Sequence, residues 1–150
     1  MSRTEATASP DLTESAARLR LAITRTARRM RQEAGSELGP SAVASLATIE
    51  RAGPLTPSEL AKHERIQRPT ATRILARLAE GGLVTRAADP ADGRCSIVTI
   101  TAEGSALLKR LRSRKNAYLA RRMRDLPDED VAALDRAAEI LERVLEGERR

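Results

Sequence analysis

The chain has 150 residues, 41% of them hydrophobic and 32% charged, which suits one domain or two small subdomains and excludes wholesale disorder. The formal net charge of +6 favours an anionic partner such as nucleic acid, and the near absence of aromatic residues argues against a protein that stacks single-stranded bases. One cysteine excludes an internal disulfide framework, and the lack of a long apolar run or an apolar leader predicts a cytoplasmic protein without a membrane partner.

The first half of the chain has a helical pattern. Residues 1–10 are small and polar, and they predict a disordered tail. From Asp11, apolar residues recur at spacings of three and four, which predicts a helix that ends near Gly35. Gly39-Pro40 then marks a break before a second, shorter helix over residues 41–52.

Two further helices with clear start signals follow. Thr56 is a good N-cap, Pro57 suits the first helical position, and Glu59 can reach back to complete a capping box. This helix is brief and leads into a turn. Pro69 favours the start of the next helix, which Gly81-Gly82 ends.

The pattern then changes from helical to β-branched. Residues 83–86 and 96–100 form two short runs around a charged, turn-rich loop, which predicts a β-hairpin. Thr101 can cap a long helix that runs to about residue 124, and Asp128 begins a last helix. We therefore predict a mainly α fold with a small β-hairpin, a winged helix-turn-helix flanked by terminal helices.

The helix that begins near Pro69 separates two faces, as the second helix of a helix-turn-helix must. Its apolar stripe consists of Ala71, Ile74, Leu75 and Leu78. Its other surface carries Arg68, Thr70, Thr72, Arg73 and Arg77. Arginine is the commonest reader of guanine, and threonine can hydrogen-bond to a base or touch a thymine methyl.

We therefore expect Arg68, Thr70 and Arg73 to contact bases. Thr72 is expected to contact a base or a phosphate, and Arg77 a phosphate. An ordinary amphipathic helix with a solvated basic face would explain this stretch taken alone. The capped short helix, the turn, the proline-started helix and the hairpin, in this order, favour DNA binding.

The predicted hairpin tip, Asp92-Gly93-Arg94, places a cation at a tight turn. We expect Arg94 to enter the minor groove beside the second helix, as inserted arginines do. Asp92 is expected to hold the Arg94 guanidinium by a charge-assisted contact. The alternative is a surface ion pair that contributes ~0–1 kcal/mol and has no role in binding.

Together these stretches resemble the MarR family of bacterial regulators, from about residue 11 to the C-terminus. The resemblance is carried by Thr56-Pro57-Ser58-Glu59-Leu60-Ala61, Arg68-Pro69-Thr70-Ala71-Thr72-Arg73, Leu78 to Leu83, Asp89-Pro90-Ala91-Asp92-Gly93-Arg94 and Thr101-Ala102-Glu103-Gly104. One departure from the family pattern is Ile100, which stands where a leucine is usual, and another is Gln67, near the usual Ser or Thr cap.

The resemblance implies a homodimer that binds a double-stranded, pseudo-palindromic operator. It implies an N-terminal dimerisation helix over residues 11–40, a DNA-binding domain over residues 41–101 and C-terminal dimerisation helices over residues 102–150. It also implies a repressor that leaves DNA when a small aromatic or phenolic ligand binds between these regions. On this basis Leu19, Ile23, Leu46 and Leu111 are candidates to line the ligand pocket, although all four would serve equally well as core residues.

Other features carry weaker hypotheses. Cys95 lies next to Arg94, and a pKa lowered by that cation would suit a redox sensor, whereas an inert side chain is the alternative. His63 is the only histidine and is expected to be structural or to lie near a phosphate. We expect no metal, no cofactor and no enzymatic activity, because neither a His/Cys cluster nor a catalytic motif is present.

The basic runs of the flanking helices are expected to pair mostly with acidic partners across packed or dimer helices, and some of residues 112–115 to touch phosphate. Two rival functions stay open at this point. One is a sequence-tolerant, architectural DNA-binding protein without an effector, and the other is a protein-interaction module.

Overall fold

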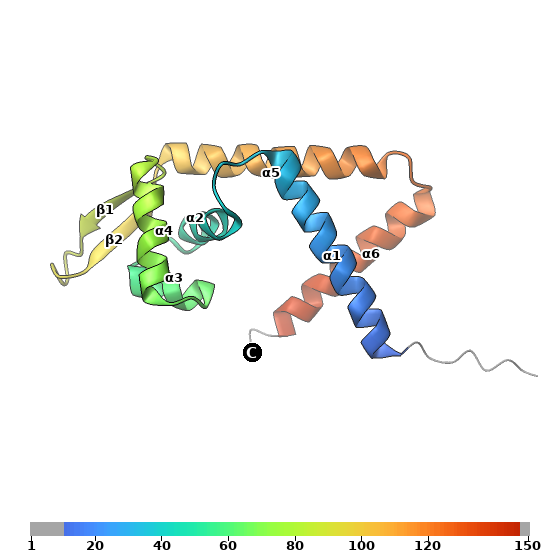
Figure 1. Cartoon of the computed structure of the whole chain (residues 1–150), viewed down its shortest axis with the longest axis horizontal. Coiled ribbons are helices and arrows are strands. Elements are labelled where there is room, and N and C mark those ends of the chain that lie inside the picture. Colours follow the sequence, from blue (N-terminus) through green and yellow to red (C-terminus); the bar gives the residue numbers. More distant parts are fainter. Residues whose placement is uncertain (1–10, 148–150) are drawn as a thin grey trace, which may run out of the picture.

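The computed structural model describes residues 11–147, which form six helices and one two-stranded antiparallel sheet. Figure 1 shows a winged helix-turn-helix unit beneath one end of a long helix, a second helix that descends from near its middle, and a last helix that follows from its other end. The elements are α1 (Leu12–Ala34), α2 (Pro40–Ala52), α3 (Pro57–Glu64), α4 (Arg68–Glu80), β1 (Val84–Ala88), β2 (Ser96–Ile100), α5 (Ala102–Met123) and α6 (Asp128–Gly147). The predicted fold class and order of elements are confirmed, whereas the domain boundaries stay a prediction.

The helix starts follow the predicted capping chemistry. Thr56 accepts a hydrogen bond from the backbone N–H of Glu59, and the Glu59 carboxylate accepts one from the backbone N–H of Thr56, at 3.2 and 2.7 Å. This is the capping box at the start of α3. Thr101 caps α5 in the same way, by accepting from Gly104 at 3.1 Å.

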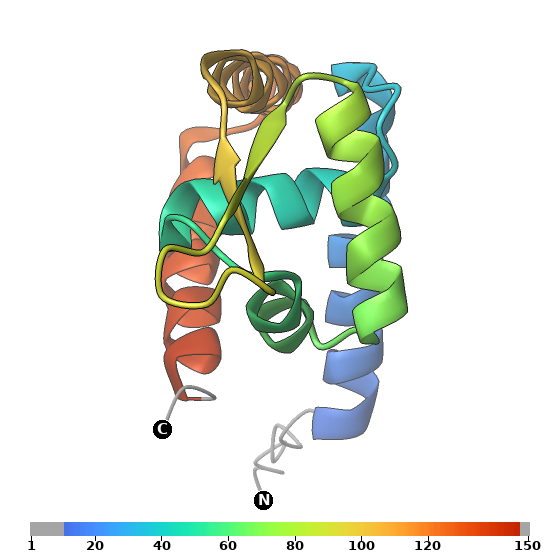
Figure 2. The ribbon, with the colours of Figure 1, turned by 90° about the vertical axis from the view of Figure 1, so that its left-hand side faces the viewer.

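The helix-turn-helix and the wing pack around α2. Figure 2, which looks onto this unit, shows α4 upright on one side, the hairpin on the other and α3 between their lower ends. Strands β1 and β2 pair from Val84 opposite Ile100 to Ala88 opposite Ser96. Leu55 adds one bridge to Val98, so the stretch before α3 is tied to the wing.

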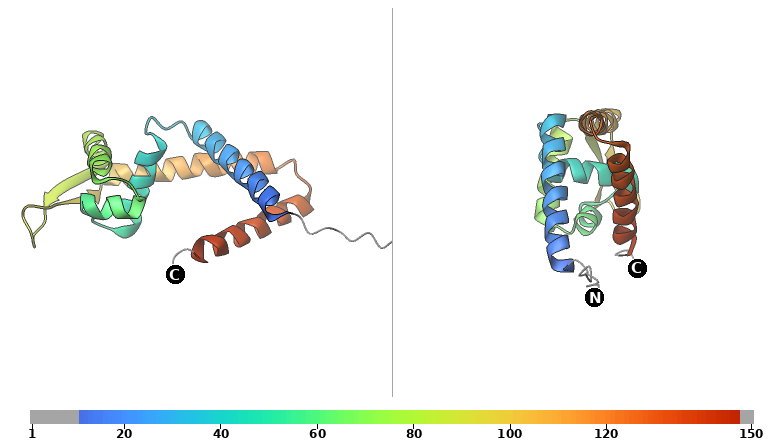
Figure 3. Two further views of the ribbon diagram at one scale, coloured as in Figure 1. Left: turned by 60° about the horizontal axis from the view of Figure 1, so that its bottom comes forward. Right: turned by 90° about the vertical axis from the view of Figure 1, so that its right-hand side faces the viewer.

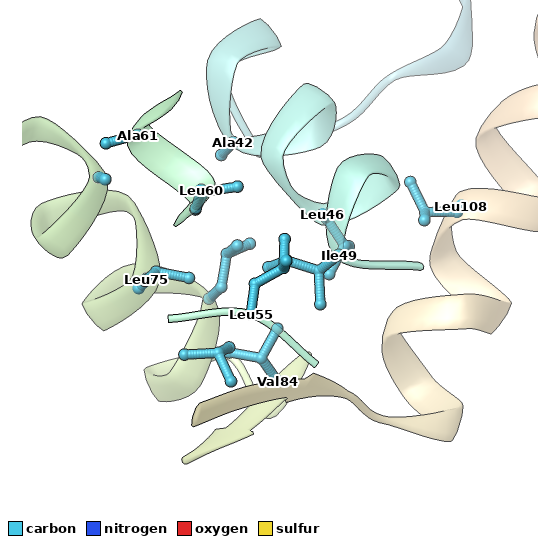
Figure 4. Packing of buried hydrophobic residues seen from close by; sticks show 12 residues of the cluster. Ala42, Leu46, Ile49, Leu55, Leu60, Ala61, Leu75, Val84 and Leu108 are labelled. Atoms are coloured by element: carbon cyan, nitrogen blue, oxygen red, sulfur yellow. The ribbon is translucent and has the colours of Figure 1, made fainter. Parts of the chain in front are cut away.

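The core is aliphatic and joins every element of this unit. Leu46 and Ile49 of α2, Leu60 of α3 and Leu75 of α4 are almost fully inaccessible to solvent. Figure 4 shows these side chains converging, with Leu108 of α5 at one edge of the cluster. This cluster fixes α4 relative to both the wing and the long helix α5.

Helices α1 and α6 extend away from this core. Figure 3 shows both on the same side of α5, and α1 packs across α5. Leu46 and Leu111 are buried, as core residues should be, but Leu19 and Ile23 of α1 are 48% and 44% exposed. The core interpretation is therefore wrong for Leu19 and Ile23 within one chain, because no element of the described residues covers that face.

Candidate nucleic-acid interface

Helix α4 presents the two faces that its sequence predicts. Ala71, Leu75 and Leu78 are fully buried, and Ile74 is half-buried against the same core. The predicted DNA-contacting side chains lie on the other side. Arg68, Pro69, Thr72, Arg73 and Arg77 are exposed, and Thr70 is partly exposed. The structure thus brings all six residues onto one outward surface, with five of them on the first two turns of the helix.

The turn that sets the direction of α4 is anchored to α2. Glu64, the last residue of α3, accepts a short hydrogen bond from the hydroxyl of Thr48, and Thr48 is buried in α2. Arg65 then adopts a left-handed conformation with φ 53°, which reverses the chain within three residues of α4. No side chain caps α4 at Gln67; the N–H groups of Thr70 and Ala71 donate to the carbonyl oxygen of Gln67 at 3.0 and 3.1 Å, and Pro69 has no N–H to satisfy.

The wing tip is shaped by two aspartates that bind the backbone. Asp89 accepts from the N–H of Ala91 at 2.9 Å, and Asp92 accepts from the N–H of Arg94 at 3.1 Å. The expectation that Asp92 holds the Arg94 guanidinium is therefore corrected: Asp92 bonds the main chain of Arg94. Its short side chain reaches an N–H two residues away more readily than the end of a long arginine. The Arg94 side chain is left exposed at the tip.

Cys95 departs from the expectation of a lowered pKa. The negative charge of Asp92 raises the pKa of the Cys95 thiol, with smaller contributions from desolvation and from a 3.7 Å hydrogen bond to the same carboxylate. Arg68 opposes this shift, which means that the first turn of α4 lies close enough to the wing to act on it. The thiol is held in its protonated form, which does not suit a reactive sensor.

A separate cavity of about 790 Å³ lies between α1, α2 and α5, the region that the resemblance implied for a ligand. The structure does not bring the four predicted lining residues together. Leu111 lines the cavity, Leu46 lies in the core, and Leu19 and Ile23 lie on the exposed face of α1. The cavity is lined instead by apolar residues that include Val43, Ala47 and Leu108, and by Arg28, Arg31, Arg112 and Lys115.

Sequence reasoning missed most of these lining residues. A usable signal was present in α5, where Leu108, Leu111, Arg112 and Lys115 recur at spacings of three, four and seven and so share one side of the helix. Of these four residues only Leu111 was predicted to line the pocket, because Arg112 and Lys115 were expected to meet acidic partners or phosphate.

The basic run of α5 has specific partners within the chain. Arg112 forms an ion pair of 2.7 Å with Glu50 of α2, and Arg114 donates to the carbonyl oxygen of Ala34 at 2.9 Å. These two arginines therefore connect α5 to α2 and to the end of α1. The Arg112–Glu50 pair confirms the expectation of acidic partners across packed helices, whereas Arg114 binds a backbone carbonyl oxygen in place of an acid or a phosphate. In the described part of α6, the acid Glu139 forms an ion pair with Arg136 of the same helix.

His63 lies exposed on α3. Within residues 11–147, no group of three or more His, Cys, Asp or Glu side chains is arranged to hold a metal ion. None of the helices in the same range is both long enough and apolar enough to cross a bilayer.

A braced helix with a cationic outer face, next to a hairpin with an exposed arginine at its tip, defines the winged helix-turn-helix class of DNA-binding proteins. The sequence model of the MarR family matches residues 38–96. An uncharacterised helix-turn-helix-type transcriptional regulator of Mycobacterium bovis is 35% identical over 82% of this chain and 87% of its own length. The chain belongs to the MarR family, whose members regulate transcription and are not enzymes.

Solved structures agree with this assignment. A protein of Pseudomonas aeruginosa assigned as a transcriptional regulator superposes with a TM-score of 0.81, at 32% identity, over 92% of this chain and 99% of the other. BpsR of Bordetella bronchiseptica, whose DNA binding is regulated by 6-hydroxynicotinic acid, has a TM-score of 0.61 at 21% identity over 89% and 94% of the two chains. At this identity the second likeness shows the fold alone.

Proposed function

We propose that the chain is a cytoplasmic repressor that binds a pseudo-palindromic DNA operator as a homodimer and leaves it when a small aromatic or phenolic ligand binds. The observation that carries the proposal is the exposed cationic outer face of the braced helix α4, accompanied by the exposed Arg94 at the tip of the wing. Neutralised phosphates supply most of the affinity, and contacts to base edges supply the sequence preference.

The contacts are assigned by position on this surface. Arg68, Thr70 and Arg73 face the bases from the first turns of α4, while Pro69 starts the helix. Arg77 lies one turn further on and contacts phosphate, and Thr72 contacts either. Arg94 enters the minor groove from a wing tip that Asp92 shapes through the backbone.

The homodimer is supported by apolar side chains that one chain leaves exposed. They lie on α1, on the last turns of α5, in the turn that follows α5 and on α6, which are away from the helix-turn-helix unit (Figure 1). The large ones are Leu12, Leu19, Leu21, Ile23, Leu119, Leu126, Leu134, Ile140, Val144 and Leu145. Large exposed apolar patches mark interfaces, and a two-fold dimer covers the same patch on both chains. Two copies of α4 then read half-sites about one helical turn apart, ~10 bp centre to centre.

The ligand site of this proposal is the cavity between α1, α2 and α5. Its apolar wall suits an aromatic ring, and its four cationic side chains favour a phenolate or carboxylate group on that ring. The regulation of DNA binding in BpsR by 6-hydroxynicotinic acid, an aromatic acid, supports a ligand of this type on the same fold.

Selection of bound DNA from a random pool tests the DNA-binding part. We expect an enriched sequence with two-fold symmetry, bound at least about a thousandfold more tightly than random DNA at the same salt concentration. A specific-to-random ratio near one would favour the architectural alternative, a sequence-tolerant binder without an effector. Absence of binding at low salt would favour a protein-interaction module.

A further inference from the structure

We propose that Arg112 is exchanged between Glu50 and an anionic ligand, and that this exchange connects the ligand cavity to the DNA-binding unit. The inference rests on the proposed function, because it takes the cavity between α1, α2 and α5 as the ligand site. It assigns Glu50 as a positioning residue that acts through Arg112, and it names the contact that the ligand breaks.

Arg112 takes part in two features of the fold, the cavity and an ion pair with α2. Its side chain lines the cavity, and its Nη2 lies 2.7 Å from Oε2 of Glu50 in α2. Arg28, Arg31 and Lys115 also line the cavity, and none of its described lining residues is acidic. An anion that enters therefore meets four cationic side chains, and Glu50 is the acid that the structure pairs with one of them, Arg112.

Helix α2 carries this contact toward α4. Glu50 and Thr48 are two positions apart, so their side chains leave opposite sides of the helix. Glu50 pairs with α5, while Thr48 donates to Glu64 at the end of α3. Three residues separate Glu64 from the start of α4. The position of α2 against α5 is therefore transmitted to the turn that directs the DNA-reading helix.

The ion pair has the properties of a contact that can be exchanged. The Arg112 and Glu50 side chains are 54% and 29% exposed, and a pair in such a setting is weak because water screens it. A ligand anion in the cavity can bind the guanidinium in a bidentate manner and displace Glu50. Displacement removes one link between α5 and α2 and favours a different position of α2.

Thermodynamic linkage between ligand and DNA binding predicts effects of a Glu50 substitution that a purely structural role of Glu50 would not produce. If Glu50 competes with the ligand, Glu50→Gln should raise ligand affinity, because Arg112 is then free. The same variant should reduce the effect of the ligand on DNA affinity, because the contact that the ligand breaks is already absent. A variant that merely loosened the fold would weaken both ligand and DNA binding.

The experiment uses the full chain, three hydroxybenzoate isomers as probes and the matching hydroxybenzamides as neutral controls. Calorimetry measures probe affinity, and fluorescence anisotropy measures affinity for the selected DNA with and without the probe. We expect hydroxybenzoates to bind more tightly than their amides. Glu50→Gln should raise hydroxybenzoate affinity about two- to fivefold, the range that an exposed ion pair supplies, and should diminish the loss of DNA affinity that the probe causes. Arg112→Gln should lower hydroxybenzoate affinity at least about tenfold.

Glu139→Gln is the matched control, because it removes an ion pair of the same 2.7 Å length from α6, which does not line the cavity. It should change neither affinity. Glu50→Asp, which keeps the charge on a shorter side chain, should fall between the wild-type chain and Glu50→Gln. Thermal melts confirm that each variant is folded.

The exchange is refuted if no hydroxybenzoate binds better than its amide, or if Glu50→Gln leaves either hydroxybenzoate affinity or the effect on DNA at the wild-type value. This failure differs from failure of the proposed function. If the proposed function fails, the wild-type chain itself shows no sequence preference in DNA selection, whatever affinities calorimetry gives for the probes.

Discussion

Arg73 and Arg77 lie one helical turn apart on the exposed side of α4, and the proposed function gives them different roles. The early turns of a reading helix enter the major groove, whereas its later turns pass the sugar–phosphate backbone. A contact to a base edge depends on sequence, and a contact to phosphate does not. The two arginines are therefore a matched pair of the same residue type on the same helix face.

We expect Arg73→Ala to cost ~1–3 kcal/mol of binding free energy and to relax the preference at one base position. Arg77→Ala should weaken binding by a similar factor on every sequence and reduce the salt slope by ~1. Affinities for the selected operator and its single-base variants, measured over a series of salt concentrations, check both statements. Equal loss on all sequences for Arg73→Ala would reassign Arg73 to phosphate.

Gly104 shows how closely α5 approaches the wing. A Cβ at this position would lie 2.3 Å from the carbonyl oxygen of Leu83 and 2.8 Å from Cγ1 of Ile100. The first is backbone and cannot move aside without shifting the strand. Only glycine therefore permits this contact between α5 and the hairpin.

Gly104→Ala should destabilise the fold by about 1–3 kcal/mol, the range of an overpacked site. Gly147→Ala is the control, since a Cβ there meets nothing within 4 Å, and it should change stability by less than about 0.5 kcal/mol. Urea unfolding at one fixed protein concentration measures both variants. Equal stability of the two would show that the wing moves freely relative to α5.

At the scale of elements, the short helix α3 depends on its capping box. With eight residues, it is too short to be stable without its cap and its packing. The hydrogen bonds from Thr56 lower the pKa of the Glu59 carboxyl below its ordinary value of 4.5, and His63 and Lys62 add smaller favourable effects. The cap of α3 is therefore sensitive to acid.

Because the folded-state pKa of Glu59 lies below its unfolded value, its contribution to stability is complete above pH 4.5 and is lost as the pH falls through the folded value. We expect Glu59→Gln to be less stable than the wild-type chain at neutral pH. The difference should shrink as the pH falls below 4.5 and through the lower folded-state pKa of Glu59. Unfolding followed by circular dichroism over this range tests it, and the effect should be smaller in a Thr56→Ala background.

Among the predictions about residues close in sequence, one was confirmed and one was wrong. Thr56, Pro57 and Glu59 predict the start of α3 correctly, because a cap involves residues only three apart. The partner of Asp92 was predicted wrongly within an equally short distance. Charge alone favoured the Arg94 guanidinium, but the geometry of the turn presents the Arg94 N–H to Asp92 instead.

At the scale of the whole molecule, most of the large apolar side chains that the described residues leave exposed lie on α1 and α6. Burying one leucine contributes about 1.5–3 kcal/mol, so a few such side chains on each chain suffice for association. Leu145 of α6 is 60% exposed in the single chain, and a charge there should be tolerated by the fold but not by an interface.

Leu145→Asp should therefore raise the dissociation constant of the dimer at least about tenfold without lowering monomer helicity. Sedimentation velocity over a dilution series measures the first quantity and circular dichroism the second. Glu142→Gln, on the same helix, should associate like the wild-type chain. Unchanged association of Leu145→Asp would exclude this part of α6 from the interface.

The sequence by itself determined the features that depend on near neighbours. Periodicity placed Ala71, Leu75 and Leu78 on the buried side of α4 and Arg68, Arg73 and Arg77 on the other, because a helix repeats every 3.6 residues whatever surrounds it. Caps and turn residues fixed where the elements begin and end.

Only the tertiary structure decided which distant groups meet. Arg112 and Glu50 are 62 positions apart, and Arg114 and the Ala34 carbonyl are 80 apart, and both contacts follow from how α5 lies against α1 and α2. Packing likewise buried Leu111 while leaving Leu19 and Ile23 exposed, although all three occupy apolar positions on helices. The physical reason is that an apolar stripe specifies a need for burial, whereas the packing of the other elements determines what satisfies it.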